Sequence, residues 1–140
     1  MTARRTPEAS LEETFLRAVA GLPDEDPSGR VVAEALGYLQ QGFDAHYAGA
    51  GASDNDILVG DNAYALSVET IARLDEPRFV AVASRMIRDG AGRIAAGERV
   101  TLETWTPHLA GLLDIISGEG TQRSEERIRR AARDLGDGLG

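Results

Sequence analysis

The sequence predicts an all-α, single-domain bundle of about six helices over residues 1–140. Apolar residues recur at helical spacing along most of the chain, and capping residues or prolines stand where these segments begin. No segment shows a convincing alternation of apolar and polar residues, which a half-buried strand requires. The length of 140 residues suits one modest core and is too short for two. Residues 1–5 are expected to be disordered.

The first two helices are bounded by turn chemistry. Thr6-Pro7 offers a first helix start, and Ser10 with Glu13 repeats the spacing of a capping box. The helix should end at Gly21-Leu22-Pro23, before a linker rich in carboxylates. The second helix should run from about Ser28 to Tyr47. The apolar positions of these helices are Leu11, Phe15, Leu16 and Val19, then Val32, Ala35, Leu36, Leu39 and Phe43.

The two middle helices are separated by the sequence LDEP. The third begins near Asp54, after the small residues 48–53, and stops before Pro77. Pro77 opens the fourth helix, with Asp75 or Glu76 as its cap, and the apolar stripe continues to about Ala96. The apolar residues are Ile57, Leu58, Tyr64, Ala65, Val68, Ile71 and Ala72, then Phe79, Val82, Ala83, Met86, Ile87 and Ile94.

For the fifth helix the sequence offers two starts. Thr106-Pro107 resembles a cap and first turn, although the fifth helix can also begin earlier, near Thr101. Ser117-Gly118 closes it. The sixth helix is expected from around Ser124, where acids precede arginines as a helix dipole favours. Their inward residues should be Leu109, Leu112, Leu113 and Ile116, then Ile128, Ala131, Ala132 and Leu135.

Composition excludes several classes of function. The formal net charge of −8 argues against a general nucleic-acid binder, which needs a basic surface. The chain has no cysteine, which excludes disulfides and thiolate metal sites and favours a cytoplasmic location. It has no lysine either, so Schiff-base and P-loop chemistry are excluded. No transmembrane segment or signal peptide is expected, because no apolar run approaches about 20 residues.

The stretch SDNDILVGDNAY, residues 53–64, concentrates aspartates that could bind a metal. Asp54 and Asp61 share a helix face but lie roughly 10 Å apart, too far for both to hold one ion. Asp56 and Asp61 diverge around the helix. Asp54 and Asp56 are better explained as groups that satisfy free N–H groups at the helix start. By itself the stretch therefore does not predict a metal site.

Other side chains give open alternatives. Arg85 and Arg88 are neighbours on one helix face, and Arg123, Arg127 and Arg130 form a second row. Such rows could bind a diphosphate or an acidic partner, or could be solvated faces paired with nearby glutamates. His46 and His108 belong to no metal-binding pattern. No catalytic residue is predicted.

The segment from Ile57 to Glu98 resembles the central part of the trans-isoprenyl (polyprenyl) diphosphate synthase family. That family has an apolar stretch ending in Gly-Asp, of the form LxGDxxxAxAxxxLA, before a turn with proline and a second apolar helix. The corresponding residues here are Leu58, Gly60, Asp61, Ala65, Ile71 and Ala72. RAARDLGDGLG, residues 130–140, resembles the helix that leads to the second metal motif. The resemblance covers roughly residues 30–140 and implies part of the isoprenoid synthase fold.

The sequence also departs from the family. Full synthases bind Mg²⁺-diphosphate through two DDxxD-type motifs. The place of the first motif reads QQGFDAHYAGAG, with Asp44 as its only acid, and the arginine pair that follows the motif is missing. The second motif should follow the final Leu-Gly, where the chain ends. Ionising an allylic diphosphate needs several Mg²⁺ ions, so this chemistry is expected to fail.

Three functions are therefore open. The first is a non-catalytic member that acts through association, as a homodimer or as a small or regulatory subunit with a full-length prenyl synthase, and needs no cofactor. The second is a small isoprenoid- or lipid-binding protein. The third is an active polyprenyl transferase whose Mg²⁺ site is rebuilt from Asp44 with Asp54, Asp56 or Asp61. A helical bundle unrelated to the family is the remaining alternative. In the second reading, the residues that could line a cavity are Tyr38, Phe43, Tyr64 and Trp105.

Overall fold

A computed structural model describes residues 9–22, 27–46 and 54–139 of the chain. These residues form six α-helices and no strand, so the predicted all-α single-domain bundle is confirmed. The helices are α1 (Leu11–Ala20), α2 (Ser28–His46), α3 (Asp54–Ala72), α4 (Pro77–Ala95), α5 (Leu102–Ser117) and α6 (Thr121–Leu139). Residues 1–5, Thr6-Pro7, the predicted boundary residues Pro23 and Tyr47, and the whole connection at 48–53 lie outside the described residues.

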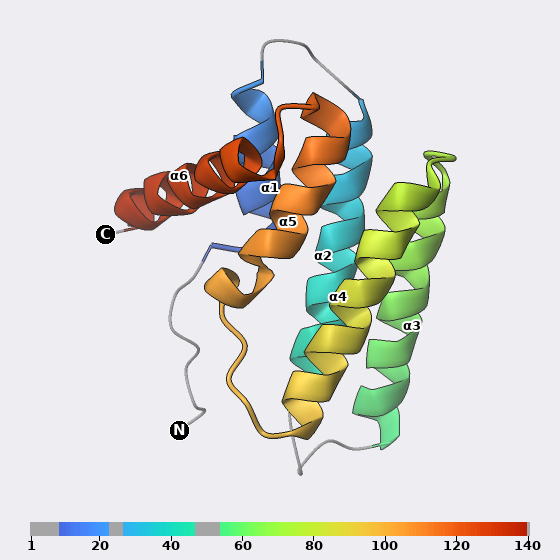
Figure 1. The fold of residues 1–140 in the computed structure, drawn as a ribbon. Coiled ribbons are helices and arrows are strands. Elements are labelled where there is room, and N and C mark those ends of the chain that lie inside the picture. The colour runs from blue at the N-terminus through green and yellow to red at the C-terminus, as the bar shows by residue number, and fades with distance from the viewer. Residues whose placement is uncertain (1–8, 23–26, 47–53, 140) are drawn as a thin grey trace.

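The helices α2, α3, α4 and α5 run side by side along the length of the bundle (Figure 1). α3 forms one edge and packs mainly on α2, with a smaller contact to α4. α6 crosses the far end of the molecule, where it contacts α5 and α1. One long side of α3 is therefore left without a neighbouring helix.

Most helix ends follow the sequence. Ser10 caps α1 by accepting a hydrogen bond from the Glu13 backbone N–H at 3.0 Å. Glu76 caps α4 in the same way, through the Arg78 N–H at 3.1 Å, with Pro77 in the first turn. α5 ends at Gly118, whose φ of 68° is favourable only for glycine. These local signals were sufficient because each acts within a few residues.

The expected starts of α5 at Thr106-Pro107 and of α6 near Ser124 are wrong. Thr101 caps α5, and its N–H donates to Thr104 Oγ1 at 3.3 Å, which confirms the earlier alternative. Pro107 therefore lies inside α5, in its second turn. α6 starts at Thr121, since the Ser124 N–H already donates to the Gly120 carbonyl at 3.1 Å. α5 and α6 are therefore separated only by residues 118–120, of which Gly118 ends α5.

The core is continuous along the bundle, and every expected apolar position of α2 is buried. At its centre Phe43 stacks on Trp105, with ring centroids 4.7 Å apart. Gly90 of α4 faces this pair, and a Cβ there would collide with both rings. Small residues thus let α4 approach the aromatic centre closely. The largest fully buried side chains are Phe15, Leu36, Leu39, Ile71, Met86, Leu109, Leu112, Leu113 and Ile128.

Hydrogen bonds and an ion pair hold α1 and α6 in place. Arg127 of α6 binds Glu119 through two nitrogens, at 2.8 and 3.1 Å, and donates to the Gly21 carbonyl at the end of α1 at 3.2 Å. At the start of α1, the Leu11 N–H donates to Gln40 Oε1 of α2 at 2.7 Å. Both ends of α1 are therefore tied by hydrogen bonds to other helices.

Candidate functional site

The outer side of α3 exposes large apolar side chains to solvent. Leu58 is 67% exposed, Val59 50% and Ile57 47%. Among the described residues, Leu16 of α1 is the other large apolar side chain with high exposure, at 38%. Three exposed apolar residues in one turn are unusual, because such side chains normally gain about 1.5–3 kcal/mol each from full burial. The apolar pattern predicted from the sequence includes Ile57 and Leu58 but not Val59, and it did not show that these side chains face outward.

Small or apolar positions recur along the same side of the helix, with the exposed acids Asp61 and Glu69 between them. Leu58, Ala65 and Ala72 are seven residues apart and lie on one face, with half-buried Val68 between them. We call these four residues the α3 outer stripe. The opposite face is buried and contains Gly60, Ala63, Tyr64, Ser67, Thr70 and Ile71. A helix that is apolar on both faces is typical of one covered on both sides.

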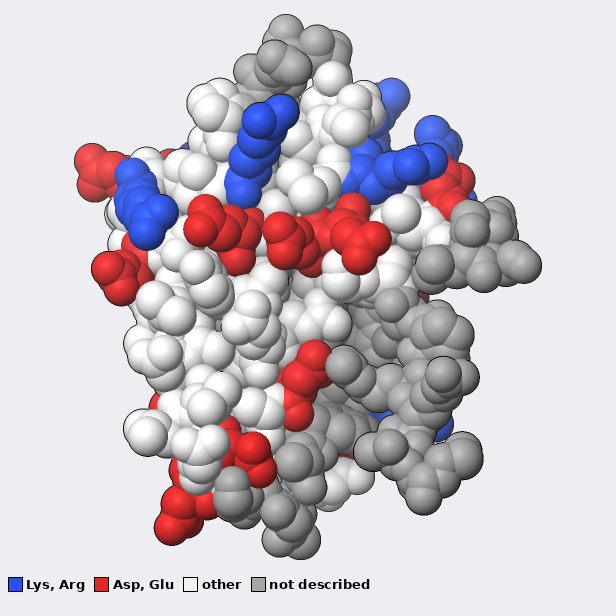
Figure 2. Space-filling view, turned by 180° about the vertical axis from the view of Figure 1, so that it is seen from behind, with Lys and Arg blue, Asp and Glu red and all other residues white. Residues whose placement is uncertain are grey.

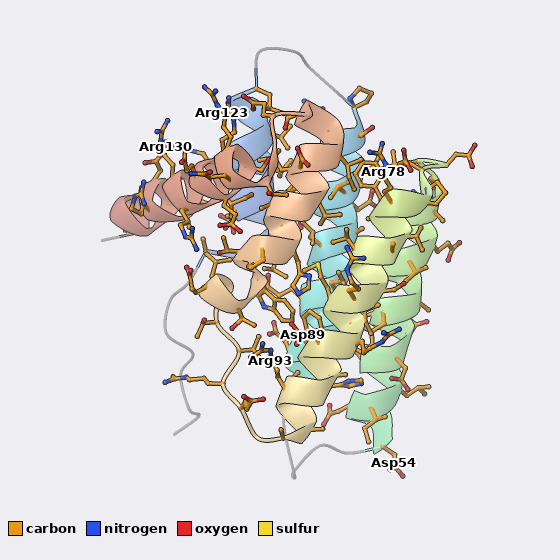
Figure 3. All side chains as sticks on the ribbon, in the orientation of Figure 1. Asp54, Arg78, Asp89, Arg93, Arg123 and Arg130 are labelled. Atoms are coloured by element: carbon orange, nitrogen blue, oxygen red, sulfur yellow. The ribbon has the colours of Figure 1, made fainter. Side chains whose placement is uncertain are left out.

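The space-filling view from behind shows the charges along the α3 edge of the molecule. The left side of Figure 2 corresponds to the α3 edge of Figure 1, and it shows an area without charged residues between acidic and basic groups above and acidic groups below. Asp54 marks the lower end of α3 in Figure 3. Exposed acids, Asp61 and Glu69, lie beside the stripe on the same side of α3.

The aspartates considered for metal binding are spread over the α2–α3 end. Asp54 and Asp56 stand in the first turn of α3, as expected for groups at a helix start, and Asp44 is exposed near the end of α2. Asp61 lies 3.3 Å from His46 Nε2. Among the residues that the structure describes, no three His, Asp or Glu side chains are grouped so that they could hold an ion.

His46 explains a feature of the Gly-Asp pair at residues 60–61. Its Nε2 lies 3.3 Å from the Ile57 carbonyl and its ring lies against Gly60. A Cβ at residue 60 would collide with this ring, so glycine is required for the close contact of α2 with α3. The role of Gly60 in this chain is therefore one of helix packing.

Three of the four aromatic candidates for a ligand cavity pack on each other. Phe43 touches Trp105 and also Tyr64, with centroids 5.4 Å apart in the second pair. Tyr38 is half-buried on α2. The Tyr64 hydroxyl is buried without a hydrogen-bond partner among the described residues. Burial, and then the charge of Asp61, raises the pKa of the Tyr64 hydroxyl far above its usual value.

Arg85 and Arg88 line a surface hollow of about 650 Å³. We call it the α4 hollow, and its lining is Arg85, Arg88, Asp89, Gly92, Arg93, Glu98 and His108. Asp89 accepts from Arg93 Nε at 2.9 Å through one carboxylate oxygen, and its other oxygen lies 3.2 Å from His108 Nε2. Figure 3 shows Asp89 and Arg93 together on the side of α4 that faces the start of α5.

Asp89 organises this hollow electrostatically. Partial burial acts to raise its pKa, but hydrogen bonds from His108 and Arg93, with the charge of Arg93, outweigh that effect and hold the pKa below its usual value. Sequence reasoning missed both Asp89 and the role of His108. The i,i+4 spacing of Asp89 and Arg93 was visible, whereas nothing local linked Asp89 to His108, 19 residues later on another helix.

The second arginine row lies at the start of α6, beside a hollow of about 560 Å³. Here Glu119 binds Arg127 at 2.8 Å and forms an ion pair with Arg123 at 3.3 Å. The hydrogen bond from Arg127, with the charges of both arginines, holds the pKa of Glu119 below its usual range. Arg123 and Arg130 extend away from the bundle in Figure 3. Glu119 therefore engages two of the three arginines of this row.

Comparisons with known protein families, with curated proteins and with solved structures find no match to this chain. Over the described ranges, no helix combines the length and the apolar character that crossing a bilayer requires. The α3 outer stripe and the α4 hollow are the two surface features that the fold itself does not explain.

Proposed function

We propose that this chain is a non-catalytic helical protein that acts through association, and that the α3 outer stripe is its binding surface. The observation that carries the proposal is the exposure of Leu58, with Ile57 and Val59 beside it, on a helix whose opposite face is already buried. Contiguous exposed apolar surface of this kind is typical of sites that bind another protein.

The occupant we propose is a second copy of this chain. Side-chain size falls along the stripe, from Leu58 at one end through Ala65 to Ala72 at the other. Leu58 and Ala72 are each seven residues from Ala65, so a two-fold axis beside Ala65 sets the large residue of one copy against the small residue of the other. The two helices then run antiparallel, which also opposes their dipoles. Side-chain size and symmetry thus favour an isologous dimer, in which the same axis also brings Asp61 of one copy near Glu69 of the other.

The resemblance to trans-isoprenyl diphosphate synthases gives a finer form of the proposal. Members of that family are commonly dimers, and some pair an active subunit with a degenerate one that adjusts product length. The resemblance implies that the third and fourth helices supply the interface and that the fold is part of the isoprenoid synthase fold. A full-length synthase would then replace the second copy on the same stripe, and this chain would be its small or regulatory subunit.

Light scattering coupled to size exclusion tests the association. We expect the wild-type chain to be dimeric and Leu58→Glu to be monomeric, because each copy would bring an unpaired charge into an apolar interface. Leu16→Glu is the matched control, since Leu16 is also exposed but lies on α1, and it should remain dimeric. A wild-type chain that stays monomeric at high concentration would refute the proposal.

Cross-linking tests the antiparallel geometry. Because the chain has no cysteine, Ala65→Cys introduces a single thiol per copy, which we expect to form a disulfide across the two-fold axis on oxidation. Ala20→Cys, on the exposed part of α1, is the control that should not cross-link. If Ala20→Cys cross-links as fast as Ala65→Cys, the contact is non-specific.

The synthase form needs a separate experiment. The chain would be co-expressed with a full-length prenyl synthase from the same genome, and the complex isolated and its product length measured. Co-purification that Leu58→Glu abolishes, with a changed product length, is the expected result. A synthase that neither binds the chain nor changes its products would remove the finer proposal and leave homodimerisation standing.

A further inference from the structure

The α4 hollow contains two arginines without a partner. Arg85 and Arg88 are exposed and three residues apart, so they lie on the same face of α4 and repel each other. No ion pair or hydrogen bond joins either side chain to another described residue, whereas Arg78 and Arg93 on the same helix are both paired. An anion placed between Arg85 and Arg88 would remove this repulsion.

The third arginine of the hollow is held in place. Arg93 uses its Nε to bind Asp89, which leaves the terminal nitrogens of the guanidinium as donors. Asp89 is itself fixed from the other side by His108 of α5 at 3.2 Å. The remaining acid of the lining is Glu98, which is exposed. Three guanidinium groups therefore face two carboxylates, and one of these carboxylates is already engaged.

The hollow has room for a small ligand. A Cβ added at Gly92 would meet no atom within 4 Å, so the surface of α4 is open there. Arg85, Arg88 and Gly92 recur on neighbouring turns of one helix face. The open position thus adjoins the two unpaired guanidinium groups.

We propose that the α4 hollow binds a phosphate-type oxyanion through Arg85, Arg88 and Arg93, with Asp89 as the residue that positions Arg93. Guanidinium groups bind phosphate oxygens in pairs, and a phosphate presents its oxygens in several directions, which suits three arginines around one space. The shared chemistry is that of inorganic phosphate and of a phosphomonoester. The site is separate from the α3 outer stripe, so it does not depend on association.

The test is an NMR titration of the ¹⁵N-labelled full chain with inorganic phosphate at constant ionic strength, following the Gly92 amide. We expect a saturable shift in the wild type. Arg88→Gln should weaken binding about tenfold, as expected for losing one charge-assisted pair. Gly92→Leu should weaken it similarly without any change of charge, because its side chain fills the open space. Glu98→Gln should tighten binding.

Two matched controls separate a site from a diffuse positive field. Arg130→Gln removes the same charge from α6, and Gly136→Leu adds the same side chain at an open glycine of α6; both should bind phosphate as the wild type does. The proposal is overturned if the wild type shows no saturable shift, if Gly92→Leu binds normally, or if Arg130→Gln weakens binding as much as Arg88→Gln does.

A second titration with phenyl phosphate identifies the source of the anion. Tighter binding of the ester would assign the hollow to the phosphate group of a larger molecule, and equal or weaker binding would assign it to the free anion. A polyglutamate peptide is the competitor. If it binds at Gly92 and phosphate does not displace it, the hollow recognises an acidic protein segment and the proposal fails.

Discussion

The neighbouring helices α3 and α4 are alike on their inner faces and opposite on their outer faces. Both bury apolar residues and use a glycine, Gly60 or Gly90, to let an aromatic or imidazole ring pack against the backbone. Outside, α3 carries four acids and no arginine around an apolar stripe, whereas α4 carries four arginines and one acid. The inner faces account for the fold, so differences in function are to be sought in the outer faces.

The largest expected effect is the difference in the free energy of unfolding between substitutions at Gly90, on the inner face of α4, and at Gly92, on its outer face. Gly90→Leu places a side chain where even a Cβ collides with Phe43 and Trp105, and we expect it to lower the free energy of unfolding by about 1–3 kcal/mol or more. Gly92→Leu, two residues along, enters open space and should raise it by up to about 1 kcal/mol through helix propensity. Urea denaturation monitored by circular dichroism measures both.

Gly60→Ala extends this comparison to α3. Its Cβ would collide with the ring of His46, whose side chain is 19% exposed and therefore less enclosed than Phe43 and Trp105. The loss should therefore be smaller than for Gly90→Leu, where both neighbouring rings are buried. If Gly60→Ala were the more destabilising change, the α2–α3 contact and not the aromatic centre would be the less adaptable part of the core.

Added salt should have different effects on association through the outer face of α3 and on phosphate binding at the outer face of α4. Association through the α3 outer stripe buries apolar surface between acidic borders, so added salt should leave it unchanged or tighten it. Phosphate binding in the α4 hollow rests on charge, so its Kd should rise severalfold between low and physiological ionic strength. Light scattering and the phosphate titration over the same salt series measure the two effects.

The opposite result would reveal a different assembly. If dimerisation weakens with salt as strongly as phosphate binding does, the acidic border of α3 in one copy would be meeting the arginines of α4 in another. Such a head-to-tail contact does not close on itself and would give larger species with rising concentration.

Local sequence signals predicted the fold well. The N-cap Ser10, Pro77 after its cap, and Gly118 each act within one turn, and the helices begin or end where these residues indicate. The errors at α5 and α6 arose where two signals competed. Thr106-Pro107 carries the same cap-and-proline pattern as Glu76-Pro77, and only the hydrogen bond of Thr101 with Thr104 places it inside the helix.

The surface features were less accessible from sequence. Ile57, Leu58 and Val59 are three consecutive apolar residues, so periodicity alone cannot decide which of them faces the core. Their exposure follows from the position of α3 at the edge of the bundle, with one side left uncovered. Likewise, the link of Asp89 to His108 depends on how α4 meets α5. Both features are products of tertiary packing.

A smaller effect concerns the acid dependence of stability. The pKa of Asp89 is lower in the folded chain than in the unfolded one, so its contribution is present above the unfolded value of about 3.9 and is lost as the pH falls through the folded value. Asp89→Asn should therefore flatten the stability curve on the acid side of about pH 4, by less than about 1 kcal/mol because the carboxylate is 34% exposed. Urea midpoints across this pH range measure it.

Arg93→Gln provides the partner control for Asp89. It removes one of the two hydrogen bonds that lower the Asp89 pKa and should flatten the same acid limb in part, while leaving the contact with His108. If neither variant changes the slope, Asp89 makes no net electrostatic contribution to folding. The charges on the α4 surface would then have no effect on the stability of the core.

The smallest expected change lies on the inner face of α3. Tyr64 buries a hydroxyl that has no hydrogen-bond partner among the described residues, and a buried unsatisfied hydroxyl is unfavourable. Tyr64→Phe keeps the ring contacts with Phe43 and His46 and should leave stability unchanged or raise it by up to about 1 kcal/mol. A clear loss of stability in Tyr64→Phe would mean that the hydroxyl has a polar partner. The inner face of α3 would then differ from that of α4 by this polar contact.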